Sequence, residues 1–197
     1  MKVGLFFGSF NPIHSGHLMV ANYIVEATDL DELWFVVSPR NPFKSAKSLL
    51  HEFDRIDMVE RAIEDNFKFK ATDVEFHLPK PSYTVTTLTH LADKLDHEFA
   101  LILGEDNLNS FHNWRNHTQI LDNHAIYIYP RPGVSPKDSV KANQQLLNHP
   151  HIQIVADAPI IGISATMIRK FVKENKSIKY LVPDNVAQMI HDRKFYT

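Results

Sequence analysis

Two kinds of hydrophobic pattern alternate along the chain. Short apolar runs, rich in β-branched and aromatic residues and bounded by Gly, Pro, Asn or Asp, are typical of buried strands. They cover residues 3–7, 33–37, 72–78, 99–103, 125–129 and 152–155. Between them, apolar residues recur every three or four positions, which predicts amphipathic helices. These helices are expected at residues 17–28, 51–66 and 84–95, with two more that begin at Thr166 and Pro183.

The order strand, helix, strand repeats along most of the chain and indicates the α/β class. Right-handed crossovers then predict a doubly wound parallel sheet with helices on both faces, followed by a helical C-terminal segment. The sequence contains no internal repeat, low-complexity segment or long linker. Residues 1–197 are therefore expected to form a single domain.

Four polar loops follow predicted strands. They are GSF at 8–10, SPRNPFK at 38–44, GED at 104–106 and PRPG at 130–133. In a doubly wound parallel sheet, ligands bind beyond the carboxyl ends of the strands. We therefore expect these loops to converge on one crevice.

Composition narrows the classes of function. The 197 residues carry a net charge of −2, with 44% hydrophobic and 22% charged residues, as in an ordinary globular protein. This charge gives no broad basic surface for nucleic acid, and no apolar run is long enough to cross a membrane. The first residues do not have the pattern of a signal peptide. The absence of cysteine excludes disulfides and thiolate chemistry and favours a cytoplasmic location.

The stretch GSFNPIHSGHL, residues 8–18, carries the most specific chemistry. It has neither the P-loop nor the dinucleotide fingerprint, yet a strand ends in glycine there and a helix opens. Free N–H groups and the positive end of a helix suit phosphate. His14 and His17 fall on one side of the first turn and can donate to phosphate oxygens. From spacing alone, a surface pair, a capping turn or a metal site without a clear third ligand also stay open.

A second polar stretch, ISATMIRKF, occupies residues 163–171. Ser164 and Thr166 are typical helix-start residues, and Arg169 falls one turn into the predicted helix. Hydroxyls, N-terminal amides and a guanidinium together suit a polyphosphate. Taken alone, the stretch is more typical of an ordinary capped helix with a solvated arginine, and only its pairing with the histidine loop favours a binding site.

Together the two stretches resemble the GxFxPxHxGH and ISxTxIR signatures of the nucleotidyltransferases that share the HxGH motif. Between them, PSYTVTTL (81–88) and LILGEDNLNSFHNWRN (101–116) are similar to the bacterial nicotinate-mononucleotide adenylyltransferases. The last stretch, YLVPDNVAQMIHDRKFY (180–196), is similar to the same family. The resemblance covers essentially the whole chain and implies a Rossmann-like nucleotidyltransferase fold.

The resemblance implies transfer of the AMP part of ATP to nicotinate mononucleotide, which gives deamido-NAD and pyrophosphate. Alternatives are an adenylyltransferase for nicotinamide mononucleotide or phosphopantetheine, and a non-catalytic nucleotide sensor that kept the fold. SYTVTTL and FHNWRN argue against the pantetheine enzyme, and the intact histidines argue against the sensor. ATP and the mononucleotide are the expected partners, without nucleic acid or membrane, and a homo-oligomer stays open.

The resemblance assigns the ATP site to both signatures and to the loop at 104–106. His14, His17 and Arg169 are the implied catalytic residues, which contact the phosphates. The residues implied in ATP binding are Gly8, Ser9, Phe10, His14, His17, Lys44, Gly104, Asp106, Ser164, Thr166 and Arg169. Gly104 and Asp106 match positions that meet the ribose. Mg²⁺ is expected as a cofactor carried by the ATP phosphates, with no protein residue named as its ligand.

For the acceptor, the resemblance implies that Trp114 stacks on the pyridine ring and that Thr84 helps to hold the substrate carboxylate. A tryptophan face suits a cationic aromatic ring, whereas core packing and helix capping are the ordinary roles of these residues. Some positions depart from the family pattern. Phe7 replaces a common glycine, Ala165 replaces a common serine, and the loop at 38–44 is one residue shorter than is typical.

Overall fold

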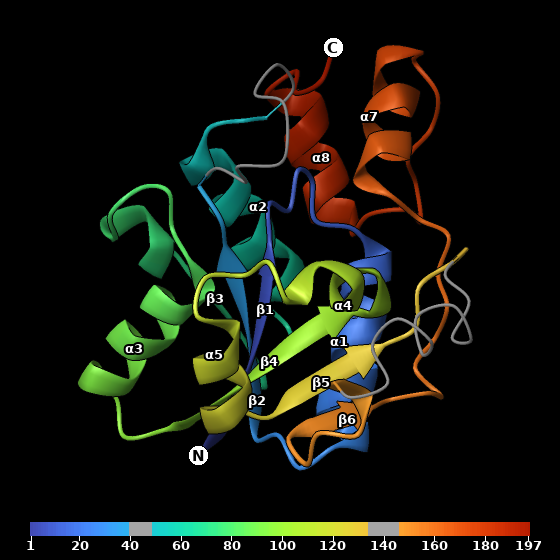
Figure 1. Ribbon diagram of the computed structural model, residues 1–197. Coiled ribbons are helices and arrows are strands. Elements are labelled where there is room, and N and C mark those ends of the chain that lie inside the picture. Colours follow the sequence, from blue (N-terminus) through green and yellow to red (C-terminus); the bar gives the residue numbers. More distant parts are fainter. Residues whose placement is uncertain (40–48, 134–145) are drawn as a thin grey trace.

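One parallel sheet organises the protein. The computed structural model describes residues 1–39, 49–133 and 146–197. Its six strands are hydrogen-bonded in the order β3-β2-β1-β4-β5-β6, and every neighbouring pair is parallel. Their bounds are β1 Lys2–Gly8, β2 Glu32–Val37, β3 Phe69–Thr72, β4 Glu98–Gly104, β5 Ile126–Tyr129 and β6 Ile152–Ile154. The order runs outward from β1 in both directions, so the predicted doubly wound α/β fold is confirmed (Figure 1).

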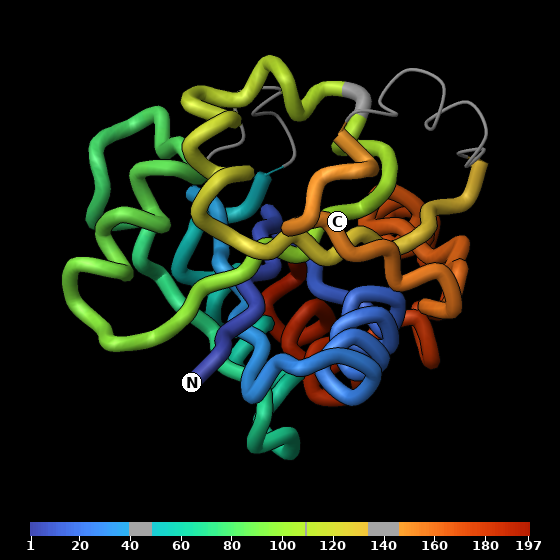
Figure 2. Tube along the Cα trace, turned by 60° about the horizontal axis from the view of Figure 1, so that its bottom comes forward, coloured from blue at the N-terminus to red at the C-terminus, as the bar shows by residue number. Residues whose placement is uncertain are grey.

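Helices cover both faces of this sheet. They are α1 Ser15–Ala27, α2 Glu52–Ile63, α3 Thr84–Lys94, α4 Glu105–Phe111, α5 His117–Asn123, α7 Ala165–Lys173 and α8 Asp184–Asp192, with a 3₁₀ helix, η2, at Val74–His77. Buried residues of α1, α2, α7 and α8 form a core on one face. Those of α3, α4 and α5 form a second core on the other. Figure 2 shows α1 in blue and α8 in red on the same side of the sheet.

The central strand β1 contributes to both cores. Val3 and Leu5 belong to the core beneath α3, α4 and α5, whereas Phe6 belongs to the core beneath α1 and α2. Successive residues of a strand face opposite sides of the sheet. Because both sides are covered here, the strand is apolar at nearly every position, as its sequence indicated.

The prediction of a strand at residues 72–78 is wrong. Most of that stretch forms η2, and the strand β3 lies earlier, at Phe69–Thr72. Polar and apolar residues alternate through the stretch, which imitates a half-buried strand, yet the neighbours Val74 and Glu75 are both buried. The N–H of Phe76 bonds back to the carbonyl of Asp73 at 2.7 Å. Such a tight turn is incompatible with extended backbone.

Helices α4 and α5 were not predicted. Each has seven residues, which is too short for helical periodicity to show in an eleven-residue window. Within the described residues, no helix is long and apolar enough to cross a membrane. Strands β1, β2, β4 and β5 end at the same edge of the sheet, which is the edge where the crevice was predicted (Figure 1).

Candidate active site

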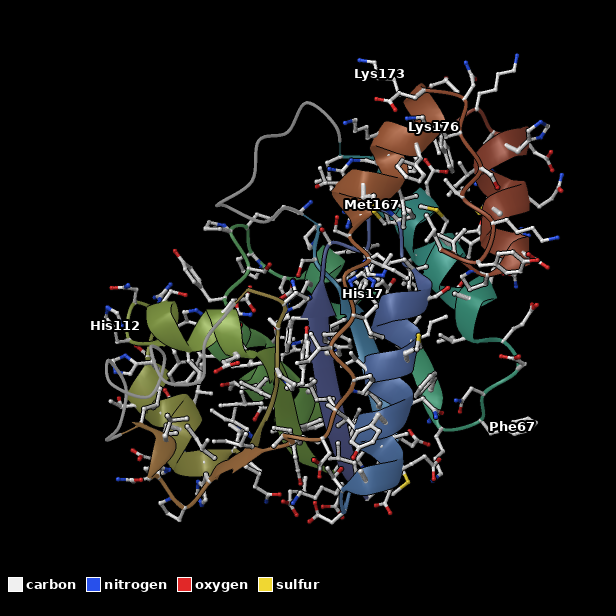
Figure 3. The ribbon with its side chains drawn as sticks, turned by 90° about the vertical axis from the view of Figure 1, so that its right-hand side faces the viewer. His17, Phe67, His112, Met167, Lys173 and Lys176 are labelled. Atoms are coloured by element: carbon white, nitrogen blue, oxygen red, sulfur yellow. The ribbon has the colours of Figure 1, made fainter. Side chains whose placement is uncertain are left out.

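The two histidines of the first signature stack on each other at the start of α1. His14 is the N-cap residue of this helix, and its Nδ1 accepts the backbone N–H of His17 at 3.3 Å. The rings have centroids 3.6 Å apart, with 19° between their planes. Figure 3 shows His17 at the first turn of α1, close to the carboxyl end of the sheet. Because Nδ1 of His14 accepts a hydrogen bond, the neutral ring carries its proton on Nε2, which can donate to a phosphate oxygen.

Burial controls the charge of His14, which is only 4% exposed. Burial first, and then the nearby guanidinium of Arg131, lower the pKa of His14 to about 4. The ring is therefore uncharged at neutral pH and acts as a hydrogen-bond donor rather than as a cation. Among the described residues, the guanidinium of Arg131 lies close enough to affect this ring.

Arg131, in the PRPG loop, is a site residue that sequence reasoning missed. It lines the same small hollow as His14 and His17, and its Nε lies 3.4 Å from Oδ1 of Asp106. Gly104 leaves room for this pair, since a Cβ there would lie only 2.5 Å from the same carboxylate oxygen. The structure thus connects the predicted ribose positions with the histidines through Arg131. Its place between two prolines at a strand end was the available signal.

The second signature reaches the loop of the first. Ser164 is the N-cap of α7, and its Oγ accepts the N–H of Met167 at 3.2 Å. From the next turn, Nη1 of Arg169 donates to the carbonyl of Asn11 at 2.7 Å. Its Nη2 donates to Oγ1 of Thr166 at 3.2 Å. The structure therefore brings these predicted phosphate-binding residues to the histidine loop, and Figure 3 shows Met167 and His17 toward the same end of the molecule.

Arg55 of α2 holds this loop in place, and sequence reasoning missed it as well. Its side chain is fully buried and donates to four backbone carbonyls. Nη1 reaches Ser9 at 2.6 Å and Ser38 at 2.7 Å, Nη2 reaches Pro39 at 2.9 Å, and Nε reaches Leu50 at 3.0 Å. The loops after β1 and β2 are therefore tied to one guanidinium. An arginine on the apolar face of a predicted helix was the signal that could have identified it.

Gly8, Ser9 and Phe10 turn the chain from β1 into the histidine loop. The ring of Phe10 packs in the core, and the residue has a φ of 41°, which bulky residues rarely adopt. A Cβ on Gly8 would lie 2.7 Å from that ring, so glycine is needed for the turn. The side chain of Phe10 is therefore used in packing, which leaves its backbone for the predicted nucleotide contact.

A cavity of about 300 Å³ opens beside these loops. Its wall includes Gly8 and Gly104 together with both predicted acceptor residues, Thr84 and Trp114. Thr84 is the first residue of α3, where helical N–H groups favour an anion. Trp114 packs against Phe111, with ring centroids 5.4 Å apart, and still lines the cavity. The structure therefore brings the acceptor residues together, next to the predicted nucleotide loops.

Two charged residues of this cavity were also missed. Among the described residues that line it, Arg115 has the only guanidinium and Glu75 the only carboxylate. The guanidinium of Arg115 lies 4.8 Å from the centre of the Tyr83 ring, a cation–π contact. Glu75 accepts the hydroxyl of Thr87 at 3.0 Å, and burial raises the pKa of its carboxyl although hydroxyl groups donate to it. Adjacency to Trp114 was the only sequence signal for Arg115.

The remaining predictions concern cations. Lys44 lies outside the described residues. In residues 1–39, 49–133 and 146–197, no group of three or more His, Cys, Asp or Glu is placed to hold a metal ion. A magnesium ion that arrives on nucleotide phosphates keeps several waters and needs few protein ligands, so it is compatible with this set of side chains.

Known proteins share this fold. The model of the cytidylyltransferase-like family matches residues 5–171. The Plasmodium falciparum nicotinic acid mononucleotide adenylyltransferase complexed with NaAD has a TM-score of 0.80 at 21% identity, covering 99% of this chain and 97% of that chain. A putative nicotinate-nucleotide adenylyltransferase from Vibrio parahaemolyticus has a TM-score of 0.69 at 17% identity, covering 99% and 94%. At these identities the likeness concerns the fold alone.

Curated relatives have much higher identity. A probable nicotinate-nucleotide adenylyltransferase of Cytophaga hutchinsonii is 58% identical over 100% of this chain and 99% of its own length. One from Flavobacterium johnsoniae is 50% identical over 100% and 99%. The matched family model, the parallel sheet and the histidine pair at its edge define a cytidylyltransferase-like protein. Within that class, the chain belongs to the nicotinate-nucleotide adenylyltransferases.

Proposed function

We propose that this protein transfers the adenylyl group of ATP to nicotinate mononucleotide and so produces deamido-NAD and pyrophosphate. One observation carries the assignment: the loop of the histidine pair, which Arg169 contacts through Asn11, lies beside a cavity lined by Thr84 and Trp114. The first group suits a polyphosphate, and the second suits a flat, acidic pyridine. Residues 1–197 act as one nucleotidyltransferase domain in this proposal, which a single sheet of strands between residues 2 and 154 supports.

The nucleophile is a phosphate oxygen of the mononucleotide. With a second pKa of about 6, this phosphate is mostly dianionic at neutral pH, so no general base is required. The oxygen forms a bond to the α-phosphorus of ATP, and the bond from that phosphorus to the oxygen bridging to the β-phosphate breaks. The bonding electrons leave with pyrophosphate. Catalysis then consists of alignment and neutralisation of charge between two anions.

The histidines and arginines supply that neutralisation. His17 donates to the α-phosphate and its transition state, while neutral His14 donates from Nε2. Arg169 and Thr166 hold the β- and γ-phosphates. Both residues lie on α7, whose N-cap residue is Ser164. Lys44 adds charge to the same phosphates. Arg131 belongs to this group because it lines the hollow of the histidines.

The nucleoside part of ATP lies toward the loops after β1 and β4. Gly104 and Asp106 meet the ribose, and Gly8, Ser9 and Phe10 offer backbone groups to the nucleotide. Mg²⁺, when bound to the phosphates, reduces the negative charge that opposes the attack. We name no protein residue as a ligand of that ion, and the hydrogen-bond donors of the chain would act on the phosphates themselves.

Recognition of the acceptor depends on charge rather than size, because a carboxylate and a carboxamide have nearly the same shape. Trp114 stacks on the pyridine ring of either substrate. Thr84 and the start of α3 donate to the carboxylate, and Arg115 adds a cation at the same cavity. An amide would turn its NH₂ group toward at least one of these donors. That donor would then have no acceptor, which costs about 1–3 kcal/mol for a buried donor. The acid is therefore the preferred substrate.

Pyrophosphate release tests the assignment and separates the alternatives. The protein is mixed with ATP, Mg²⁺ and, in separate reactions, nicotinate mononucleotide, nicotinamide mononucleotide or phosphopantetheine. We expect fast release with the acid mononucleotide and slower release with the amide. Release that is fastest with either other acceptor would reassign the substrate. Binding of ATP without release in any reaction would identify a nucleotide sensor.

A further inference from the structure

The residues that follow α8 return to the histidine loop. The ring of Tyr196 packs against the core formed by α1, α2, α7 and α8. Its hydroxyl donates to Oδ1 of Asn11 at 2.9 Å, across 185 positions of sequence. In Figure 1, this end of the chain lies at the same edge of the molecule as the loop that leaves β1.

Asn11 links this hydroxyl to the second signature. The side-chain oxygen of Asn11 accepts from Tyr196 and also from the N–H of Leu50 at 3.3 Å. The backbone carbonyl of Asn11 accepts from Nη1 of Arg169 at 2.7 Å. Asn11 is 4% exposed, so water does not readily replace these donors. One buried residue therefore connects the segment after α8 to the arginine of α7.

We propose that Tyr196 is a positioning residue, which holds Asn11 so that its carbonyl aims the Arg169 guanidinium at the ATP phosphates. The proposal rests on the proposed role of Arg169 in binding ATP. A guanidinium held by a fixed acceptor loses less freedom when it meets a phosphate than one that is free to turn. Nη1 of Arg169 is fixed by Asn11 and Nη2 by Thr166, so the side chain is oriented before ATP arrives.

The surroundings of Tyr196 keep it a donor. Burial raises the pKa of its hydroxyl, although the guanidinium groups of Arg169 and Arg55 oppose that rise. The phenol is therefore protonated throughout the working pH range. Removal of the hydroxyl alone would leave the ring packing intact and the Asn11 side chain with one donor fewer, so Tyr196→Phe isolates the hydrogen bond.

Steady-state kinetics with Tyr196→Phe test the proposal, with Tyr180→Phe as the matched control because Tyr180 is 80% exposed. We expect KM for ATP to rise about threefold to tenfold, the range that one neutral hydrogen bond usually carries, while KM for the mononucleotide stays within twofold. The control should match the wild type. Partial unfolding of the variant would lower the active fraction, and hence the apparent kcat, without changing either KM.

A double-mutant cycle distinguishes positioning from a merely structural role. If Tyr196 acts through Arg169, Tyr196→Phe should change KM for ATP less than about twofold in an Arg169→Ala background. Equal effects in both backgrounds, or an unchanged KM for ATP in the single variant, would overturn the inference. If Arg169→Ala itself leaves ATP binding unchanged, the proposed role of Arg169 fails instead, and the two failures are therefore distinguishable.

Discussion

The proposed phosphate end of the site and the proposed acceptor cavity differ in how the chain supplies them. The phosphate end comes mainly from two continuous stretches, 8–18 and 163–171, that meet through the hydrogen bond from Arg169 to Asn11. Buried groups then fix it, above all Arg55, whose guanidinium holds four carbonyls. The result is a set of donors that are in place before substrate arrives, as the proposed catalysis by charge neutralisation requires.

The acceptor cavity is assembled from many separate segments. Its wall takes residues from the ends of β1 and β2, from η2, from the start of α3 and from the stretch after α4. Its cation, Arg115, is exposed at the surface and rests on the Tyr83 ring. In the described part of the chain, fewer buried hydrogen bonds fix this region than the loops around Arg55, so we expect a substitution there to change which substrate is preferred without disturbing the chemistry. The two regions should therefore fail in different ways.

The largest effect is expected at the anchor of the phosphate end. Arg55→Met keeps an apolar stem but leaves four carbonyls without their donor, so the free energy of unfolding should fall by about 3–5 kcal/mol. Urea denaturation measures this loss. Arg61→Met is the matched control, since Arg61 lies in the same helix and forms an exposed pair with Asp57, and such pairs contribute little to stability. Similar losses in both variants would show that the buried hydrogen bonds of Arg55 stabilise the protein no more than the exposed pair of Arg61 does.

The next effect separates chemistry from stability. His17→Ala removes the proposed donor to the transition state, which should lower kcat about a hundredfold, or about 3 kcal/mol. The melting temperature should change little, because His14 retains its place as N-cap residue. Kinetics and a thermal melt measure both quantities. His191→Ala serves as control because that side chain is 85% exposed, and near wild-type turnover in folded His17→Ala would remove His17 from the mechanism.

The pKa of His14 predicts a smaller effect, confined to mild acid. The folded protein holds this pKa at about 4, against 6.5 for the unfolded chain. Between these values the unfolded chain binds more protons, so stability falls as the pH falls from 6.5 toward 4. His14→Asn replaces the Nδ1 acceptor of the N-cap by a side-chain oxygen and removes the titration. The stability advantage of the wild type over this variant should shrink by about 2 kcal/mol between pH 7 and pH 5, as urea denaturation at both pH values will show. A constant difference would mean that His14 is not buried in neutral form.

The same contrast explains what the sequence could predict. The helix starts and strand ends at the two signature stretches were predicted. They depend on local rules, namely helix caps, turns and continuous apolar runs. The hydrogen bonds around buried Asn11 were not predicted, since its partners Leu50, Arg169 and Tyr196 are distant in sequence. Only the folded chain brings such donors and acceptors together.

The acceptor cavity was predicted only in part, for a related reason. Thr84 and Trp114 follow from the family resemblance, whereas Glu75 lies in the stretch where alternation falsely indicated a strand. In a strand with Val74 turned inward, Glu75 would face the opposite side. In η2 both are buried, and the carboxyl group reaches the hydroxyl of Thr87 instead. Because this stretch was predicted as a strand and not as η2, Glu75 was not predicted to line the cavity.

The smallest effect should be a change of preference rather than of rate, and it concerns Arg115. Arg115→Gln removes the charge but keeps hydrogen-bonding groups, so the ratio of kcat/KM for acid over amide should fall about fivefold to tenfold, which is modest because exposed charges are screened. Turnover of the amide should stay within twofold.

Trp114→Ala should weaken the binding of both substrates equally and leave the ratio unchanged. Arg115→Lys should recover part of the ratio that Arg115→Gln loses. Added salt should lower the ratio in the wild type but not in Arg115→Gln. If Arg115→Gln keeps the wild-type ratio while Thr84→Ala loses it, recognition of the carboxylate belongs to the start of α3 alone.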